Sequence, residues 1–148
     1  MGDVIGTSTA KRIAVATAVA GTLDILAAIG LTLFYGGKVD RMLRYVASGP
    51  FPGAKDWGAG GAVLGLAVHF ALMAVMAAVF VLAADRIAAL KARPLLWGVV
   101  YGLVTWAAMN LVVVPLRFGT MPSATGIATQ LFCHIVLVGV PIAYIARR

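Results

Sequence analysis

The chain contains no glutamate and only one cysteine, Cys133. A single cysteine excludes an internal disulfide and a cysteine-based zinc cluster, so we expect Cys133 to be a small buried hydrophobe. Only 11% of the 148 residues are charged, against about a quarter in a typical soluble domain. Hydrophobic residues make up 62%, more than a soluble fold of this length could bury. The composition predicts an integral membrane protein with one transmembrane domain over residues 1–148.

The sequence also lacks the motifs of the common enzyme classes. It has no His-Glu-x-x-His zinc motif, no phosphate-binding loop, no nucleophile elbow and no Cys-x-x-Cys-His haem attachment site. These absences weigh against an enzyme. The net charge of +7 comes from basic residues at the ends of apolar segments, not on one face between aromatic residues. That distribution predicts the lipid bilayer as a partner and no nucleic acid.

Four apolar segments are long enough to cross a bilayer, which takes about 20 helical residues. The predicted spans are residues 13–35, 62–84, 95–116 and 124–146. The first is longer than the apolar run of a signal peptide, so we expect a retained helix. The sequence therefore predicts an all-α fold, a bundle of four transmembrane helices.

The segment after the first span predicts a short amphipathic helix over residues 38–47. Its apolar residues recur three and four positions apart, at Val39, Met42, Leu43 and Val46. Such a helix lies in the membrane interface with its basic face toward the lipid headgroups. Of the twelve Lys and Arg residues, seven lie on the side of the two termini. This excess favours both termini in the cytoplasm.

Pairs of glycines spaced four residues apart predict close helix packing in the second and third spans. The pairs are Gly61 with Gly65 and Gly98 with Gly102. In lipid, small residues at this spacing let two helix backbones approach each other. The same motif serves packing within one chain and homodimerisation, and the sequence leaves both open.

Each span carries one strongly polar residue at a similar depth: Asp24, His69, Asn110 and His134. Gln130 lies one helical turn from His134 on the same face. A polar or ionisable side chain in hydrocarbon is costly, normally faces the bundle interior and marks a functional site. We therefore predict that these five residues form a protonatable intramembrane site for an ion, a proton or a lipid-like ligand.

Two alternatives remain open at this stage. His69 and His134 are suited to hold a b-type haem axially or, together with Asp24, a divalent metal. Met73 and Met76 follow His69 on the same helix face, and thioethers with imidazole suit copper(I), although methionine more often fills core gaps. In the second alternative the polar residues only hold neighbouring helices together, and the protein is an accessory or structural membrane subunit.

Short motifs around the polar residues are similar to those of a known family. They are Gly-Thr-Leu-Asp-Ile at 21–25, Gly-Leu-Ala-Val-His-Phe at 65–70, Tyr-Gly at 101–102, Met-Asn at 109–110, Val-Pro-Leu at 114–116, and residues 134–143. On these motifs the chain resembles a family of small four-helix proteins of the bacterial inner membrane. The resemblance covers all four spans and implies a multi-pass inner-membrane protein. It transfers no catalytic residues, because no activity is established for that family.

Overall fold

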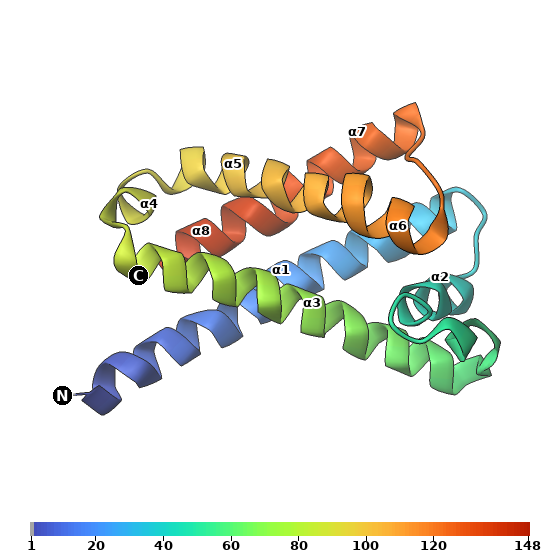
Figure 1. Ribbon diagram of the computed structural model, residues 1–148, viewed down its shortest axis with the longest axis horizontal. Coiled ribbons are helices and arrows are strands. Elements are labelled where there is room, and N and C mark those ends of the chain that lie inside the picture. Colours follow the sequence, from blue (N-terminus) through green and yellow to red (C-terminus); the bar gives the residue numbers. More distant parts are fainter. Residues whose placement is uncertain (1) are drawn as a thin grey trace.

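The computed structural model describes residues 2–148, with side chains from Ser8 onward. Every regular element in this part of the chain is helical (Figure 1). Four helical stretches are long and apolar enough to cross a membrane: Ser8–Phe34, Gly58–Arg86, Pro94–Phe118 and Ala124–Ala146. The predicted all-α bundle of four transmembrane helices is therefore confirmed.

The first two spans are continuous α-helices, and the last two each contain a π-helical turn. The first span is α1 (Gly2–Phe34) and the second is α3 (Gly58–Arg86). The third consists of α5 (Pro94–Ala107), the π-helical η2 (Ala108–Val113) and α6 (Val114–Phe118). The fourth consists of α7 (Ala124–Phe132), the π-helical η3 (Cys133–Gly139) and α8 (Val140–Ala146). The connections contain α2 (Val39–Ala47), the 3-10 helix η1 (Pro52–Asp56) and α4 (Ala88–Ala92). The short helix predicted over residues 38–47 is thus present as α2.

The glycine pairs pack against backbone of the same chain. Gly61 and Gly65 of α3 face the backbone of η1 and α2, whereas Gly98 and Gly102 of α5 face the backbone of η3 and α8. All four glycines are buried. Intramolecular packing therefore occupies these surfaces, and homodimerisation through them stays a prediction.

Among the four spans, the most extensive packing joins α1 with α3, α5 with η3 and α8, and α1 with η3 and α8; α2 also packs closely on α3. In contrast, α3 and α5 meet mainly through side chains. The Tyr101 hydroxyl donates to the Met76 carbonyl over 2.7 Å, and its ring lies 4.9 Å from that of Phe80.

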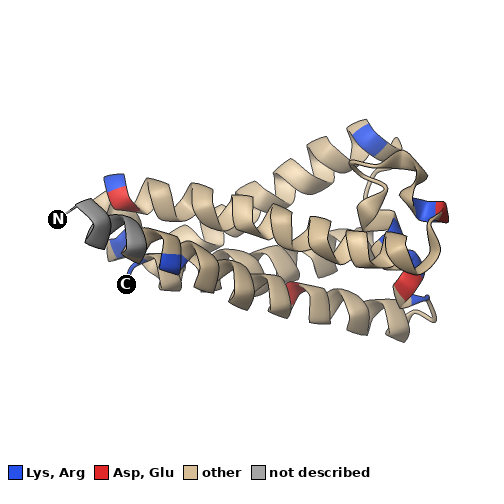
Figure 2. Cartoon of the chain, turned by 90° about the horizontal axis from the view of Figure 1, so that it is seen from below, with Lys and Arg blue, Asp and Glu red and all other residues tan. Residues whose placement is uncertain are grey.

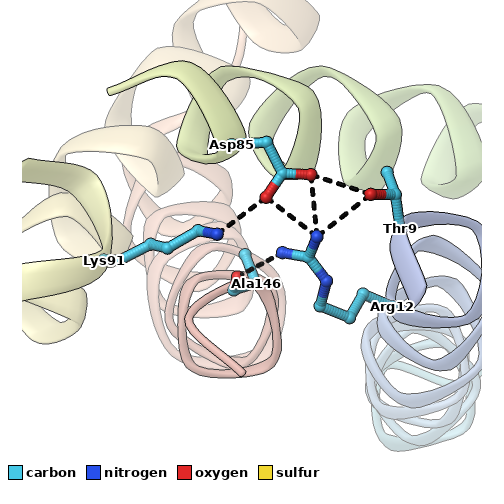
Figure 3. A network of polar contacts seen from close by, with 5 residues as sticks. All are labelled: Thr9, Arg12, Asp85, Lys91 and Ala146. Carbon is cyan, nitrogen blue, oxygen red and sulfur yellow. Dashed lines mark hydrogen bonds and ion pairs between the residues drawn. The ribbon is translucent and has the colours of Figure 1, made fainter. Parts of the chain in front are cut away.

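Charged residues gather at the two ends of the bundle (Figure 2). At the end that holds both termini, the Asp85 carboxylate accepts hydrogen bonds from Arg12 and Lys91 at 2.7 Å and from Thr9 at 2.9 Å (Figure 3). Arg12 also donates to the Ala146 carbonyl over 2.8 Å. This network joins α1, α3, α4 and α8 where the spans end.

Candidate intramembrane polar site

A cavity of about 260 Å³ inside the bundle brings the five predicted site residues together. Its polar lining comes from five elements: Asp24 of α1, His69 of α3, Asn110 of η2, Gln130 of α7 and His134 of η3. The remaining wall is apolar or contains sulfur, and α2 contributes to it from the end of the bundle away from the termini. Residues far apart in sequence thus line one partly open cavity within the membrane-spanning region.

A backbone carbonyl of α1 determines which ring nitrogen of His69 carries a hydrogen. Its Nε2 lies 2.9 Å from the Gly21 carbonyl oxygen. Because a carbonyl only accepts hydrogen bonds, Nε2 must carry the hydrogen and donate. The other ring nitrogen, Nδ1, faces Asp24 Oδ2 at 3.9 Å. In the neutral imidazole, the nitrogen without a hydrogen, Nδ1, therefore faces the carboxyl group.

Asp24 and His69 lie close enough for the charge of one side chain to affect the charge of the other. The two side chains are only 19% and 10% exposed, so an unpaired charge on either would be costly. The favourable states are a neutral acid facing a neutral imidazole, or a carboxylate facing an imidazolium. Movement of one proton between Oδ2 and Nδ1 interconverts them and leaves the net charge of the pair unchanged.

The local sequence explains how α3 comes so close to α1 here. Gly21 is buried, and a Cβ added to it would lie 2.6 Å from the Phe70 ring. The missing side chain lets Phe70 pack against α1, which brings the adjacent His69 within reach of the Gly21 carbonyl. Gly21 thus has two roles where α1 and α3 cross. Its lack of a side chain makes room for Phe70, and its carbonyl accepts the hydrogen bond from His69.

His134 is oriented by Thr105, which the sequence analysis did not identify. The Thr105 hydroxyl donates to the Gly102 carbonyl over 3.1 Å, and His134 Nδ1 lies 3.2 Å from the same hydroxyl oxygen. Since the hydroxyl has one hydrogen and gives it to Gly102, it must accept from Nδ1. In neutral His134 the lone pair is therefore on Nε2, and the side chain lines the cavity. This nitrogen can accept a hydrogen bond from a ligand.

Asn110 and His134 lie in the two π-helical segments, η2 and η3. Proline occupies the second position of the helix that follows each segment, at Pro115 and Pro141. A proline lacks the backbone N–H and its ring clashes with the carbonyl four residues back, so the helix widens ahead of it. Asn110 Nδ2 donates to the Trp106 carbonyl of its own helix over 3.2 Å. Single π-helical turns occur frequently at functional sites.

The arrangement does not favour the haem and divalent-metal alternatives. In the described part of the chain, no three His, Cys or Asp side chains are close enough together to hold a metal ion. A cavity of about 260 Å³ is also below the usual range of about 300–1,000 Å³ for pockets that hold drug-sized ligands. His69 and His134 therefore have no room for a haem between them in this conformation.

Sulfur-containing side chains form much of the remaining wall. The cavity is lined by Cys133 and by four methionines, Met42, Met73, Met76 and Met109. Met73 and Met76 were expected on the His69 face, and the structure places them there. Methionine fits irregular spaces well, so these residues shape a soft and adaptable wall around the polar groups.

No family model, curated protein or solved structure matches the chain. The resemblance to small four-helix inner-membrane proteins therefore stays a prediction that rests on the sequence motifs. The structure itself supports a multi-pass membrane protein, because four of its helices are long and apolar enough to span a bilayer.

Proposed function

We propose that this protein binds and relays a proton at the Asp24–His69 pair, in a cavity that takes an ion or a lipid-like ligand. One observation carries the proposal. The carboxyl oxygen and His69 Nδ1 face each other at 3.9 Å, while Nε2 is fixed by the Gly21 carbonyl. Ionisable groups placed in this way inside a membrane protein are typical of proton relays and coupled ligand sites.

The geometry suggests how protonation and ligand binding would be coupled. A shift of about 1 Å would bring Oδ2 and Nδ1 to the length of a charge-assisted hydrogen bond, about 2.7–2.9 Å. A cation in the cavity would stabilise the Asp24 carboxylate, whereas a neutral ligand would leave the acid protonated. His134 Nε2, with its lone pair, supplies a hydrogen-bond acceptor for a ligand in the same cavity.

We also propose that the protein resides in the bacterial inner membrane with both termini in the cytoplasm. The support is the resemblance together with seven Lys and Arg residues on the terminal side against five on the other. A reporter enzyme active only in the cytoplasm, fused after Arg148, should be active. Activity of a periplasm-specific reporter at the same position would reverse the proposed orientation.

Infrared difference spectroscopy tests the proton site directly. Purified protein in liposomes should show a carboxylic acid carbonyl band that changes with pH, and Asp24→Asn should remove it. Asp40→Asn is the matched control, because Asp40 lies outside the spans in α2 and its side chain is 57% exposed. A pH-dependent spectrum that is identical in wild type and Asp24→Asn would refute a titrating Asp24.

A flux measurement then separates a relay from helix packing. Liposomes that contain the protein and a trapped pH indicator should dissipate an imposed proton gradient faster than empty liposomes. His69→Gln should abolish the difference, because glutamine still donates to the Gly21 carbonyl but does not take up a proton. If Asp24→Asn and His69→Gln lower only the unfolding temperature, the accessory-subunit alternative is the correct one.

A further inference from the structure

A basic pocket of about 650 Å³ lies at the end of the bundle away from the termini. Its lining includes four cationic side chains and one carboxylate: Arg41, Arg44, Lys55, Arg117 and Asp56. The cations come from the neighbouring elements α2 and η1 and from α6, which is distant from both in sequence. Several cations around one concave space form a favourable site for a phosphate group.

The wall of this pocket is fixed by hydrogen bonds and ring stacking. Arg117 donates over 2.7 Å to the carbonyls of both Ser48 and Gly49, and its guanidinium lies 5.0 Å from the ring centre of Phe118. The Phe118 ring stacks in turn on Tyr45 at 4.4 Å. These contacts join α6 to the end of α2 and hold the pocket open without a ligand.

Two of the four cations remain available to a ligand. Arg44 donates to Asp40 over 2.8 Å and to the Lys55 carbonyl over 2.7 Å, and this pairing holds the pKa of the Asp40 carboxyl below its usual range. In contrast, the side chains of Arg41 and Lys55 make no hydrogen bond or ion pair with the described residues. Asp56 is the opposing charge in the lining.

An apolar groove of about 360 Å³ continues from the basic pocket into the membrane-spanning region. Its walls come from α2, α3 and η2 with α6, and include Val68, Leu72, Met109 and Val113. The distance along the third span from Arg117 to Met109 is about 12 Å, from eight residues at the helical rise. The groove is thus long enough to take a substantial part of an acyl chain.

The three spaces are neighbours that share wall residues. The groove shares Tyr45, Arg117 and Phe118 with the basic pocket. It shares Val46, Leu72, Met109 and Val114 with the cavity that contains Asp24 and His69. The polar, cationic pocket therefore borders an apolar groove, and the other end of the groove borders the polar cavity.

We propose that this pocket and groove bind one anionic phospholipid of the surrounding bilayer. Its phosphate lies between Arg41 and Lys55, and one acyl chain lies in the groove between α2, α3 and η2. The combination of cations at the mouth and an apolar interior matches an amphiphile of this charge. The site does not depend on proton uptake at Asp24, so the two proposals can fail separately.

Native mass spectrometry of the purified protein in detergent tests the headgroup site. With phosphatidylglycerol and phosphatidylcholine of identical acyl chains added, we expect one phosphatidylglycerol to stay bound in preference. Arg41→Gln with Lys55→Gln should weaken this binding about tenfold. Lys11→Gln with Lys38→Gln removes the same charge outside the pocket and should leave it unchanged. Equal binding of both lipids, or equal loss in both double variants, would show only general electrostatic attraction and overturn the proposal.

A substitution in the groove tests the acyl-chain site. Val113→Trp should fill the groove and weaken binding of long-chain phosphatidylglycerol, while the dihexanoyl form, with its short chains, should bind as before. Val112→Trp is the matched control, because Val112 is exposed but does not line the groove. If Val113→Trp has no effect on the long-chain lipid, or if inorganic phosphate displaces it completely at equal concentration, the pocket binds a soluble anion and the lipid assignment is wrong. Circular dichroism verifies that each variant retains its helical content.

Discussion

At the scale of single residues, the orientation of His134 depends on one hydroxyl group. Thr105 accepts from His134 Nδ1, and a buried N–H without a partner costs about 1–3 kcal/mol. We therefore predict that Thr105→Val lowers the free energy of unfolding by about that amount, whereas Thr105→Ser, which keeps the hydroxyl, stays close to wild type. Denaturant titration in mixed micelles measures the difference. Nitrogen NMR of labelled histidine should also lose the Nδ1–H signature in the valine variant alone, and an unchanged His134 signal there would contradict the assignment.

Residues of the site differ in how far the sequence could predict them. Asp24, His69 and His134 stand out because an ionisable side chain within an apolar span is rare and expensive. Thr105 gives no such signal, since threonine is common in membrane helices and its hydroxyl can bond to its own backbone. The Gly21 carbonyl has no side chain to mark it, although its role follows once α1 and α3 are placed together.

At the scale of elements, the π-helical turns set which side chains face the cavity. Cys133 and His134 are adjacent, and in an α-helix they would point about 100° apart, yet both line the cavity from η3. Periodicity alone predicts the spans but does not locate a π turn. The prolines that follow η2 and η3 are the local signal that the helices cannot continue unchanged.

The η3 turn gives a prediction that uses the only cysteine of the chain as a reporter. Pro141→Ala restores a backbone N–H and lets the fourth span close as a regular α-helix, which rotates residues 133–134 relative to α8. Cys133, 4% exposed, should then react several-fold faster with a membrane-permeant maleimide. Pro122→Ala, in the connection before α7, is the control and should leave the labelling rate unchanged. Equal rates in both variants would mean that Pro141 does not maintain the turn.

At the scale of the whole molecule, hydropathy predicts the spans but not their ends or their order in the bundle. The α1 helix begins before the predicted 13–35 and α3 extends beyond both ends of 62–84, because polar and glycine residues continue the helical hydrogen bonds past the apolar core. The separation of α3 from α5 has no counterpart in the sequence pattern.

The two ends of the molecule should therefore respond differently to substitution. At the terminal end, Asp85 neutralises Arg12, whose side chain is only 12% exposed, and Lys91. Asp85→Asn leaves these two cations near each other without the carboxylate, and we predict a loss of about 2 kcal/mol in the free energy of unfolding. Lys91→Gln should cost less than about 1 kcal/mol, because Lys91 is 35% exposed and such pairs contribute little. Thermal unfolding in detergent measures both. The network around Asp85 is remote from α2. Lipid binding and the Asp24 carbonyl band should therefore be unaffected in folded Asp85→Asn. Loss of either would mean that the two ends of the bundle are coupled.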